Sequence, residues 1–339
     1  MIATRHIAAF DVGPIGLGCM NLSHAYGLPP PPEAAERFLL RALDLGVKLF
    51  DTAALYGFGA NETLVGRVLR PHRGRIVLAS KGGMAGVTFD DGIKRVIDGR
   101  PEAIRRDCEG SLRRLQTDVI DLYYLHRWHK AVPIEDSVGA MADLVRAGKV
   151  RALGLSEVSA ATLRKAHAVH PIAAVQSEYS LWTRNPEIAV LKACREIGAA
   201  FVAFSPVARG FLCGGLRDVA TLDAKDIRRA MPRFEPGPWS ANLALLPPYE
   251  ALAREAGCTP SQLALAWLLT RGPHVVPIPG TTSVDHLREN LQAAQVRLEP
   301  GLLARLDALI NPATVAGARY NAGNQKEIDT EDFAPAAPP

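Results

Sequence analysis

Residues 119–155 read VIDLYYLHRWHKAVPIEDSVGAMADLVRAGKVRALGL and contain two apolar runs that flank a helical pattern. The first run, 119–125, is short and rich in aliphatic and aromatic residues, which favours a strand. Residues 134–147 place apolar side chains at helical spacing and stop before Gly148, a residue common just after a helix. A second strand is expected at 150–155. A strand, a helix and a strand in this order predict parallel pairing with a right-handed crossover.

The same alternation extends in both directions along the chain. We expect strands at 15–17, 47–50, 76–80, 119–125, 150–155, 173–176, 199–204 and 274–277. We expect helices at 33–45, 61–69, 102–115, 134–147, 160–169, 188–197, 261–269 and 284–294. Eight strand–helix units in roughly 300 residues predict an α/β protein, a single-domain (β/α)8 TIM barrel.

The rival architecture is an open, doubly wound sheet, which favours a G-x-G-x-x-G turn after an early strand. The glycine-rich segments GPIGLG (13–18), GLGCMN (16–21) and GFGANE (57–62) all lack that spacing. The closed barrel is therefore the favoured prediction.

Composition excludes several classes of protein. The 339 residues include 39 basic and 35 acidic ones, a formal net charge of +4, and 48% are hydrophobic. The small charge excess argues against a nucleic-acid surface, which needs a clustered basic face. No apolar run approaches the ~18 residues of a membrane helix. Five scattered cysteines and the absence of a signal-like N-terminal stretch predict a reduced, cytoplasmic protein.

Three segments interrupt the alternation. Residues 84–100 and 207–240 follow the third and seventh strands, and long loops after barrel strands usually build the functional face. We expect the barrel to occupy residues 1–311. The remainder, 312–339, ends in DFAPAAPP and is expected to be a partly mobile tail.

Ionisable residues stand at the ends of three adjacent predicted strands. Asp51 ends the second strand in LFDTAALYG, with Tyr56 five positions later; Lys81 ends the third in LASKGG, and His126 ends the fourth in DLYYLHRWH. A buried lysine is costly unless it is paired, and Asp51 can supply the counter-charge. Lys81 can then lower the pKa of the Tyr56 phenol, which would donate a proton to a carbonyl oxygen that His126 orients. Such protonation needs a hydride donor, hence a nicotinamide cofactor.

The segments DTAALYG (51–57), LASKGG (78–83) and YYLHRWH (123–129) resemble the three catalytic segments of the aldo-keto reductase superfamily. GLSEVS (154–159), VQSEYS (175–180), FSPVARGFL (204–212) and IPGTTSVDHLREN (278–290) resemble the family's later strand ends. The likeness spans about residues 15–290 and is nearest to the bacterial general reductases, more distantly to the potassium-channel β subunits.

The resemblance implies a (β/α)8 barrel that binds NADPH, with Asp51, Tyr56, Lys81 and His126 as the catalytic tetrad. It implies that Ser156 and Gln176 hold the nicotinamide carboxamide and that Phe204 stacks on the ring. The full set of implied cofactor residues is Gly18, Cys19, Met20, Asp51, Ser156, Glu157, Gln176, Phe204, Ser205, Pro206, Val207, Arg209, Gly210, Gly280, Thr281, Thr282, His286, Glu289 and Asn290. Glu157 departs from the neutral or basic residue that the family usually has there.

The choice between NADPH and NADH stays open at this point, although we favour NADPH. The family's usual cation near the strand-eight glycine is replaced here by Thr281, Thr282 and His286. The loop 223–233 adds four cations that could fold over the cofactor or form a solvated basic helix: Lys225, Arg228, Arg229 and Arg233.

The expected substrate is a small aldehyde or ketone, in contact with Tyr56, His126 and Trp128. Further residues near the expected mouth are Met20, His24, Tyr26, Phe58, Arg127, residues 84–89, Arg319 and Tyr320. A redox-sensing regulatory subunit with slow turnover is the alternative function. A metal-dependent hydrolase built on Asp51, His126 and His129 would leave Tyr56 and Lys81 unused, so we expect no metal site. The oligomeric state cannot be read from the sequence.

Overall fold

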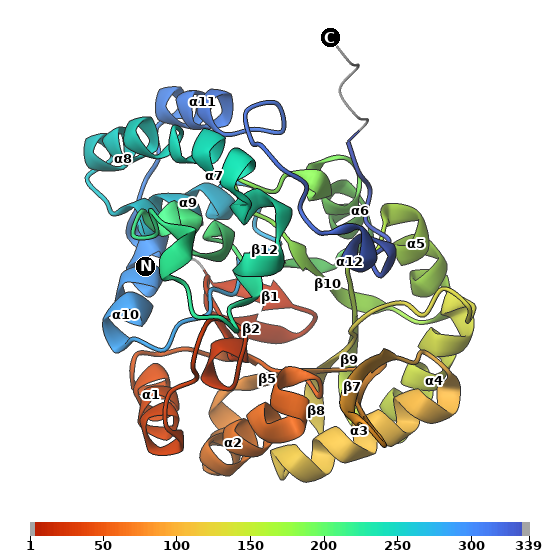
Figure 1. Ribbon diagram of the computed structural model, residues 1–339. Coiled ribbons are helices and arrows are strands. Elements are labelled where there is room, and N and C mark those ends of the chain that lie inside the picture. Colours follow the sequence, from red (N-terminus) through yellow and green to blue (C-terminus); the bar gives the residue numbers. More distant parts are fainter. Residues whose placement is uncertain (1–3, 334–339) are drawn as a thin grey trace.

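Eight parallel strands form the centre of the molecule in the computed structural model, which describes residues 4–333 (Figure 1). In chain order they are β3 (Leu17–Gly18), β4 (Leu49–Asp51), β5 (Val77–Gly82), β8 (Ile120–Leu125), β9 (Val150–Ser156), β10 (Ile172–Glu178), β11 (Ala200–Phe204) and β12 (Val275–Pro277). Each strand pairs with its neighbours in this order. The ring closes where Gly16 and Gly18 donate hydrogen bonds to the carbonyls of Pro277 (3.0 Å) and Pro279 (3.2 Å). The predicted barrel is confirmed.

Eight helices follow the strands and surround them (Figure 1). They are α1 (Pro32–Asp44), α2 (Ala60–Leu69), α3 (Pro101–Leu115), α4 (Ile134–Arg146), α5 (Ala160–Val169), α6 (Val190–Ile197), α9 (Pro260–Leu269) and α10 (Val284–Gln292). Local signals fix their ends. The Thr259 hydroxyl accepts from the Gln262 amide in a capping box at the start of α9, and Gly198 ends α6 with a φ of 73°.

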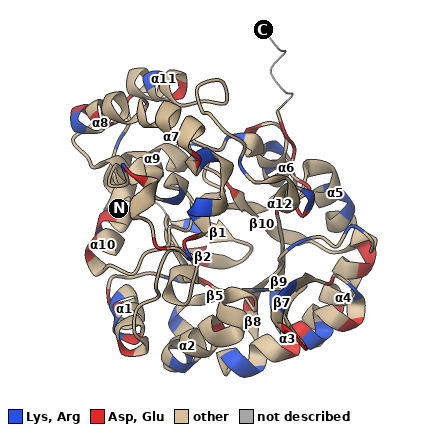
Figure 2. Ribbon diagram, viewed as in Figure 1, with Lys and Arg blue, Asp and Glu red and all other residues tan. Residues whose placement is uncertain are grey.

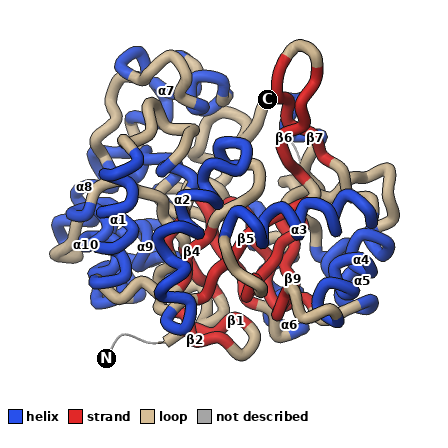
Figure 3. The backbone as a smooth tube through the Cα atoms, turned by 90° about the horizontal axis from the view of Figure 1, so that it is seen from below, coloured by secondary structure: helices blue, strands red, loops and turns tan. Residues whose placement is uncertain are grey.

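Four helices were not predicted. They are α7 (Pro236–Leu243), α8 (Leu246–Glu255), α11 (Pro300–Leu309) and α12 (Ala322–Lys326). Helix α8 packs on α9, and α11 packs on α8 (Figure 1). Helix α7 lies nearer the end of the barrel that carries the β6–β7 hairpin (Figure 3). Both signs of charge occur on the same outer helices, such as α1 and α3, rather than on one basic face (Figure 2). In the described range 4–333, no helix is long and apolar enough to cross a membrane.

Residues 84–100 form a hairpin, where we had expected only a long loop. Strand β6 (Met84–Phe89) pairs antiparallel with β7 (Gly92–Ile97), and the turn uses Gly92 at a φ of 117°. This hairpin projects from the end of the barrel opposite to a second hairpin, β1 (Arg5–Ile7) and β2 (Phe10–Val12) (Figure 3). Ile7 and Val12 are buried among the inward-facing side chains of the barrel strands, so the second hairpin closes that end.

The described part of the tail, residues 312–333, packs on the end of the barrel that carries the β6–β7 hairpin. The Asp329 amide donates to the carbonyl of Glu157 (2.9 Å), and its carboxylate accepts from the hydroxyls of Ser159 and Thr162 at the start of α5 (3.0 and 2.6 Å). Ile328 is buried. The rest of the tail predicted to be mobile, residues 334–339, lies outside the described residues.

Candidate active site

A pocket of about 780 Å³ opens among the carboxyl ends of the strands, where barrel proteins usually place their sites. Its lining runs continuously from Tyr56 and His126 to Thr281 and His286 near the N-terminus of α10. The volume lies in the range of small-molecule sites, roughly 300–1,000 Å³. Strands far apart in sequence therefore share one cavity.

Lys81 is the buried centre of the polar cluster. Its ammonium, which is fully enclosed, ion-pairs with the Asp51 carboxylate and donates to the Thr52 carbonyl (2.8 Å) and to the Tyr56 hydroxyl (3.2 Å). Burial alone would lower the pKa of Lys81, but Asp51 and Tyr56 outweigh it and the pKa is raised. Lys81 is therefore a cation that contacts the phenol directly.

Tyr56 lies at the start of a short 3-10 helix (Tyr56–Gly59) and lines the pocket. We expected Lys81 to lower the pKa of this phenol. Lys81 does act in that direction, but burial, assisted by the Asp51 charge, is stronger, so the pKa of Tyr56 is raised above 10.0. The phenol thus holds its proton at neutral pH, as a proton donor must.

His126 faces the same pocket, and its ring centroid lies 5.9 Å from that of Tyr56 at an interplanar angle of 83°. Burial first, and then the charges of Arg127, Lys81 and Arg95, hold its pKa well below 6.5. The imidazole is therefore neutral at neutral pH and has one N–H to donate.

Asp51 links this cluster to the expected carboxamide residues. Besides Lys81, its carboxylate accepts a hydrogen bond from the Gln176 side-chain amide (2.8 Å). Ser156 lies on the neighbouring strand β9, where its hydroxyl accepts from Arg127 (3.1 Å) and keeps its own hydrogen for a ligand.

Most of the residues expected to bind cofactor or substrate line this one pocket. They are Gly18, Met20, Asp51, Tyr56, His126, Ser156, Gln176, Phe204, Ser205, Pro206, Val207, Arg209, Gly210, Gly280, Thr281, Thr282 and His286. His24, Tyr26, Met84, Arg127 and Tyr320, expected near the mouth, also line it.

Four of the expected cofactor residues do not line the pocket. Cys19 is fully buried behind it, and Asn290 is buried within α10. Glu289 accepts a hydrogen bond from the Thr259 side chain on the neighbouring helix α9. The fourth, Glu157, turns its carboxylate to the backbone amide of Glu178 (3.0 Å) and to the Arg319 guanidinium. The carboxylates of Glu157 and Glu289 are therefore already bound by other protein groups.

Of the expected residues 84–89 only Met84 lines the pocket, and three other expected substrate-side residues also lie elsewhere. The Trp128 indole donates to the Val132 carbonyl (2.9 Å) and packs against the hydrophobic core. Phe58 is half-exposed outside the lining, and Arg319 is buried beneath it. Trp128 therefore stabilises the loop after β8 and does not line the pocket.

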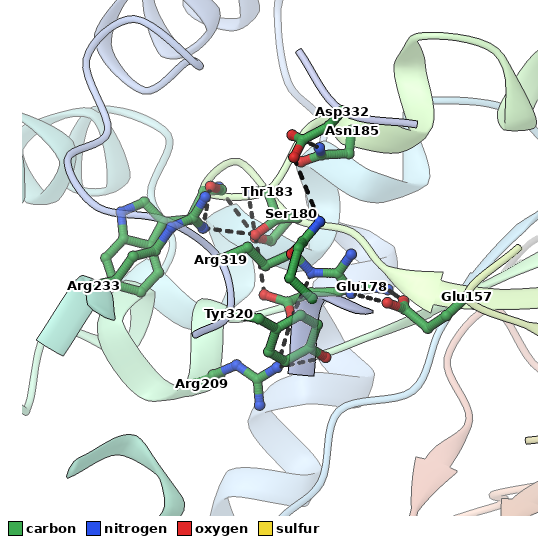
Figure 4. A network of polar contacts seen from close by, with 12 residues as sticks. Glu157, Glu178, Ser180, Thr183, Asn185, Arg209, Arg233, Arg319, Tyr320 and Asp332 are labelled. Carbon is green, nitrogen blue, oxygen red and sulfur yellow. Dashed lines mark hydrogen bonds and ion pairs between the residues drawn. The ribbon is translucent and has the colours of Figure 1, made fainter. Parts of the chain in front are cut away.

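Arg319 belongs to a buried ion-pair network beside the pocket (Figure 4). Its guanidinium lies between Glu157 and Glu178, and Glu178 also pairs with Arg209 (2.6 Å). Burial alone would raise the pKa of Glu178, but the neighbouring arginines lower it to about 2. Tyr320 lies against Arg209, 5.7 Å from ring centroid to guanidinium carbon. The network thus holds Arg209 at the pocket wall.

Of the four cations in the loop 223–233, only Arg228 lines the pocket. It pairs with Asp226 (2.7 Å) and donates to the Arg209 carbonyl (3.1 Å). Arg229 donates to backbone carbonyls of its own loop, and Arg233 donates to the Trp182 carbonyl (2.6 Å) (Figure 4). Of these four cations, Arg228 is therefore the one placed where it could contact a cofactor in the pocket.

Sequence reasoning missed part of the lining. Arg95 from the β6–β7 hairpin and Asn324, Glu327 and Ile328 from the tail belong to it. The segment VTFDDGIKRV (87–96) contains an Asp-Gly turn between β-prone runs, which is a hairpin signal. The tail residues carry no comparable signal, because their contacts are far away in sequence.

The pocket residues fit a dinucleotide on chemical grounds. Ser156 and Gln176 are polar groups beside the proton donor, the Phe204 ring can stack, and Arg209 and Arg228 are cations suited to phosphates. Non-glycine residues with positive φ gather after β11, at Ser205 (49°), Ala208 (52°) and Arg209 (55°). Such conformations cost about 1–3 kcal/mol each and concentrate at ligand sites.

The barrel thus brings a buried lysine, a tyrosine and a neutral histidine together at the carboxyl ends of its strands. The model of the Aldo/keto reductase family matches residues 14–311. The chain belongs to this family.

Individual relatives agree with this assignment. The chain is 43% identical over 315 residues to Probable aldo-keto reductase 1 of Glycine max. The alignment covers 93% of this chain and 90% of that protein. The structure of the glycerol dehydrogenase from Gluconobacter oxydans superposes on this chain with a TM-score of 0.83 at 29% identity. The superposition covers 90% of this chain and 94% of the other. An aldo/keto reductase from Klebsiella pneumoniae in complex with NADP and acetate gives a TM-score of 0.70 at 29% identity, covering 92% and 95%.

Proposed function

We propose that this protein is an NADPH-dependent reductase that converts aldehydes or ketones to alcohols. The observation that carries the proposal is the contact of the Lys81 ammonium with the Tyr56 hydroxyl at 3.2 Å, inside the pocket that His126 also lines. A protonated phenol beside a buried cation and a neutral imidazole is suited to receive a carbonyl oxygen on which negative charge develops.

Each side chain of the cluster has a separate task. The Tyr56 hydroxyl donates a hydrogen bond to the carbonyl oxygen and then transfers its proton to it. Lys81 stabilises the phenolate that remains, and Asp51 keeps Lys81 charged and in place. The neutral His126 donates a second hydrogen bond and orients the carbonyl. A bound nicotinamide supplies the hydride to the carbonyl carbon and is itself oxidised.

The cofactor proposal rests on the pocket residues and on the relatives. Ser156 and Gln176 would hold the carboxamide, Phe204 would stack on the nicotinamide, and Arg209 would meet the pyrophosphate. Solved structures of Klebsiella pneumoniae aldo-keto reductases hold NADP and NADPH. We favour NADPH over NADH because Thr281, Thr282 and the N-terminus of α10 lie with Arg228 in the same pocket.

We also propose that the protein works in the cytoplasm, since all five cysteines are free thiols.

Titration with NADPH and with NADH, followed by quenching of tryptophan fluorescence, tests the cofactor assignment. We expect saturable binding of both, with tighter binding of NADPH. A panel of aldehydes and ketones is then assayed by loss of NADPH absorbance. Absence of binding by either dinucleotide would contradict the proposed function, and binding without reduction of any carbonyl would contradict its catalytic part.

A further inference from the structure

Two arginines close to His126 line the pocket and have no role in the reaction described above. Arg127 follows His126 directly at the end of β8, and Arg95 comes from β7 of the hairpin. Burial is the main cause of the lowered pKa of His126. The positive charge of Arg127 is the next largest cause, and the charge of Arg95 also contributes. Both charges therefore act on the space where a carbonyl would lie.

Arg127 has an unused hydrogen-bonding edge. Its two hydrogen bonds both leave from Nη1, to the backbone carbonyl of His126 (2.6 Å) and to the Ser156 hydroxyl (3.1 Å). Within residues 4–333, its Nε and Nη2 hydrogens have no acceptor and no carboxylate forms an ion pair with it. The Nε–Nη2 edge of a guanidinium is a fork that matches the two oxygens of a carboxylate.

The carboxylates of the described lining are already paired. Asp51 binds the Lys81 ammonium, and Glu327 pairs with Arg95 (2.5 Å). The Arg95–Glu327 pair also joins the hairpin to the tail across the pocket. The charge of Arg127 is thus left without a counter-charge in a half-enclosed site, an arrangement that favours an anionic ligand.

The lining also includes apolar side chains, beside polar ones such as His24 and Asn324. Met20, Leu55, Met84 and Ile328 contribute side chains that suit a hydrocarbon or aromatic segment of a ligand.

We propose that the physiological substrate is an aldehyde or ketone that also carries a carboxylate, which Arg127 binds through its Nε and Nη2 hydrogens while Tyr56 and His126 hold the carbonyl oxygen. This inference rests on the proposed function and narrows its substrate class. Arg127 is then a specificity-determining residue, because it distinguishes charged from neutral carbonyl compounds of the same shape.

The test compares 4-carboxybenzaldehyde with 4-formylbenzamide, which have the same ring and nearly the same size but differ in charge. With NADPH, the wild-type protein is expected to prefer the acid by about tenfold or more in kcat/KM, the size of effect typical of a charge-assisted hydrogen bond. In Arg127→Met the preference falls to about one. Any general effect of losing the Ser156 contact changes both substrates alike and cancels in the ratio.

Lys94→Met is the matched control. Lys94 precedes Arg95 in β7, pairs with Asp91 (2.5 Å) and does not line the pocket. Lys94→Met also removes one positive charge, but outside the pocket, so the preference for the acid is expected to persist. If Arg127→Met does not fold, Arg127→Gln removes the charge but keeps an amide donor, and the same ratio is measured.

Equal kcat/KM for the two aldehydes in the wild-type protein, or a preference that survives loss of the Arg127 charge, would overturn the inference and leave the reductase proposal intact. Reduction of neither aldehyde would contradict the reductase proposal instead. Calorimetric titration of the NADP⁺ complex with each aldehyde then decides the inference without turnover. Tighter binding of the acid that disappears in Arg127→Met supports it, and equal binding overturns it.

Discussion

The guanidinium of Arg319 is ion-paired with the carboxylate of Glu157, which lies 162 residues earlier, directly after β9. Neither side chain is more than 7% exposed. Arg319 also reaches Glu178 at 3.2 Å, so the C-terminal segment supplies a cation to two buried carboxylates of the barrel (Figure 4). The described part of the tail, residues 312–333, is therefore held against the barrel by buried ion pairs.

Replacing Arg319 by Met is expected to lower the free energy of unfolding by about 3–5 kcal/mol, because it leaves the buried Glu157 carboxylate without its ion-pair partner. Glu178 keeps its pair with Arg209. Urea unfolding followed by circular dichroism measures the change. The double variant Arg319→Met with Glu157→Gln is expected to lose less stability than Arg319→Met alone, since the unpaired charge of Glu157 is removed.

Arg305→Met is the control for this prediction. Arg305 pairs with Glu255, and both side chains are about half exposed (53% and 52%). Loss of such a surface pair is expected to change stability far less, because solvent screens exposed charges. Equal destabilisation by the two arginine substitutions would contradict the buried-network interpretation.

Tyr56→Phe removes the proposed proton donor and keeps the ring. We expect kcat for aldehyde reduction to fall by about 10²–10⁴-fold, the usual contribution of general acid catalysis, while the Kd for NADPH stays nearly unchanged. Tyr123→Phe, on β8, is the matched control: its buried hydroxyl has no hydrogen-bond partner in the described residues and does not line the pocket. Wild-type turnover in Tyr56→Phe would show that the proton comes from elsewhere.

The pKa shifts at the site predict a flat pH profile for reduction. A raised pKa means that Tyr56 keeps its proton beyond pH 10.0, and a lowered pKa means that His126 is already neutral at pH 6.5. Between these values neither group changes its protonation state, so kcat/KM for a neutral aldehyde is expected to stay constant. A stopped-flow series across this range measures it, and an ionisation near pH 7–8 that disappears in Tyr56→Phe would contradict the assignment.

The lowered pKa of Glu178 predicts that the folded protein loses stability in acid. Its pKa is about 2 in the folded protein against an ordinary value of 4.5, because the neighbouring arginines outweigh burial. A depressed pKa contributes stability that is complete above pH 4.5 and is lost as the pH falls toward 2. The Tm of the wild-type protein is therefore expected to fall more steeply in that window than the Tm of Glu178→Gln. Glu33→Gln, at an exposed position of α1, is expected to follow the wild-type slope.

Gly66 marks the close contact of α2 with the end of α3. A Cβ at this position would lie 2.5 Å from backbone atoms of Leu115, which cannot move independently of the helix. Gly66→Ala is expected to destabilise the protein by about 1–3 kcal/mol through overpacking. Gly139→Ala, within α4, meets nothing within 4 Å and is expected to stabilise by about 0.5–1 kcal/mol through helix propensity. A thermal or urea unfolding series in which both variants shift alike would contradict this reading.

Much of the fold and of the catalytic cluster was predictable because the information is local. The predicted strands and helices of the eight units agree with the structure to within a few residues. Asp51, Lys81 and His126 end consecutive strands of the barrel, and parallel strands bring their carboxyl ends together. The hairpin at residues 84–97 was missed although its Asp-Gly turn was visible.

The sequence by itself therefore determined the barrel, the strand ends and the candidate tetrad, because strand and helix periodicity and the residue at each strand end depend on neighbours along the chain. Only the tertiary structure decided which side chains are free. Glu157 stands at a strand end like Ser156, yet its carboxylate is bound to Arg319 and is unavailable to a ligand. Arg127 follows His126, lines the pocket and has no acceptor for its Nε and Nη2 hydrogens among residues 4–333. Pairing between buried charges depends on distances in space, and these join residues that no local pattern connects.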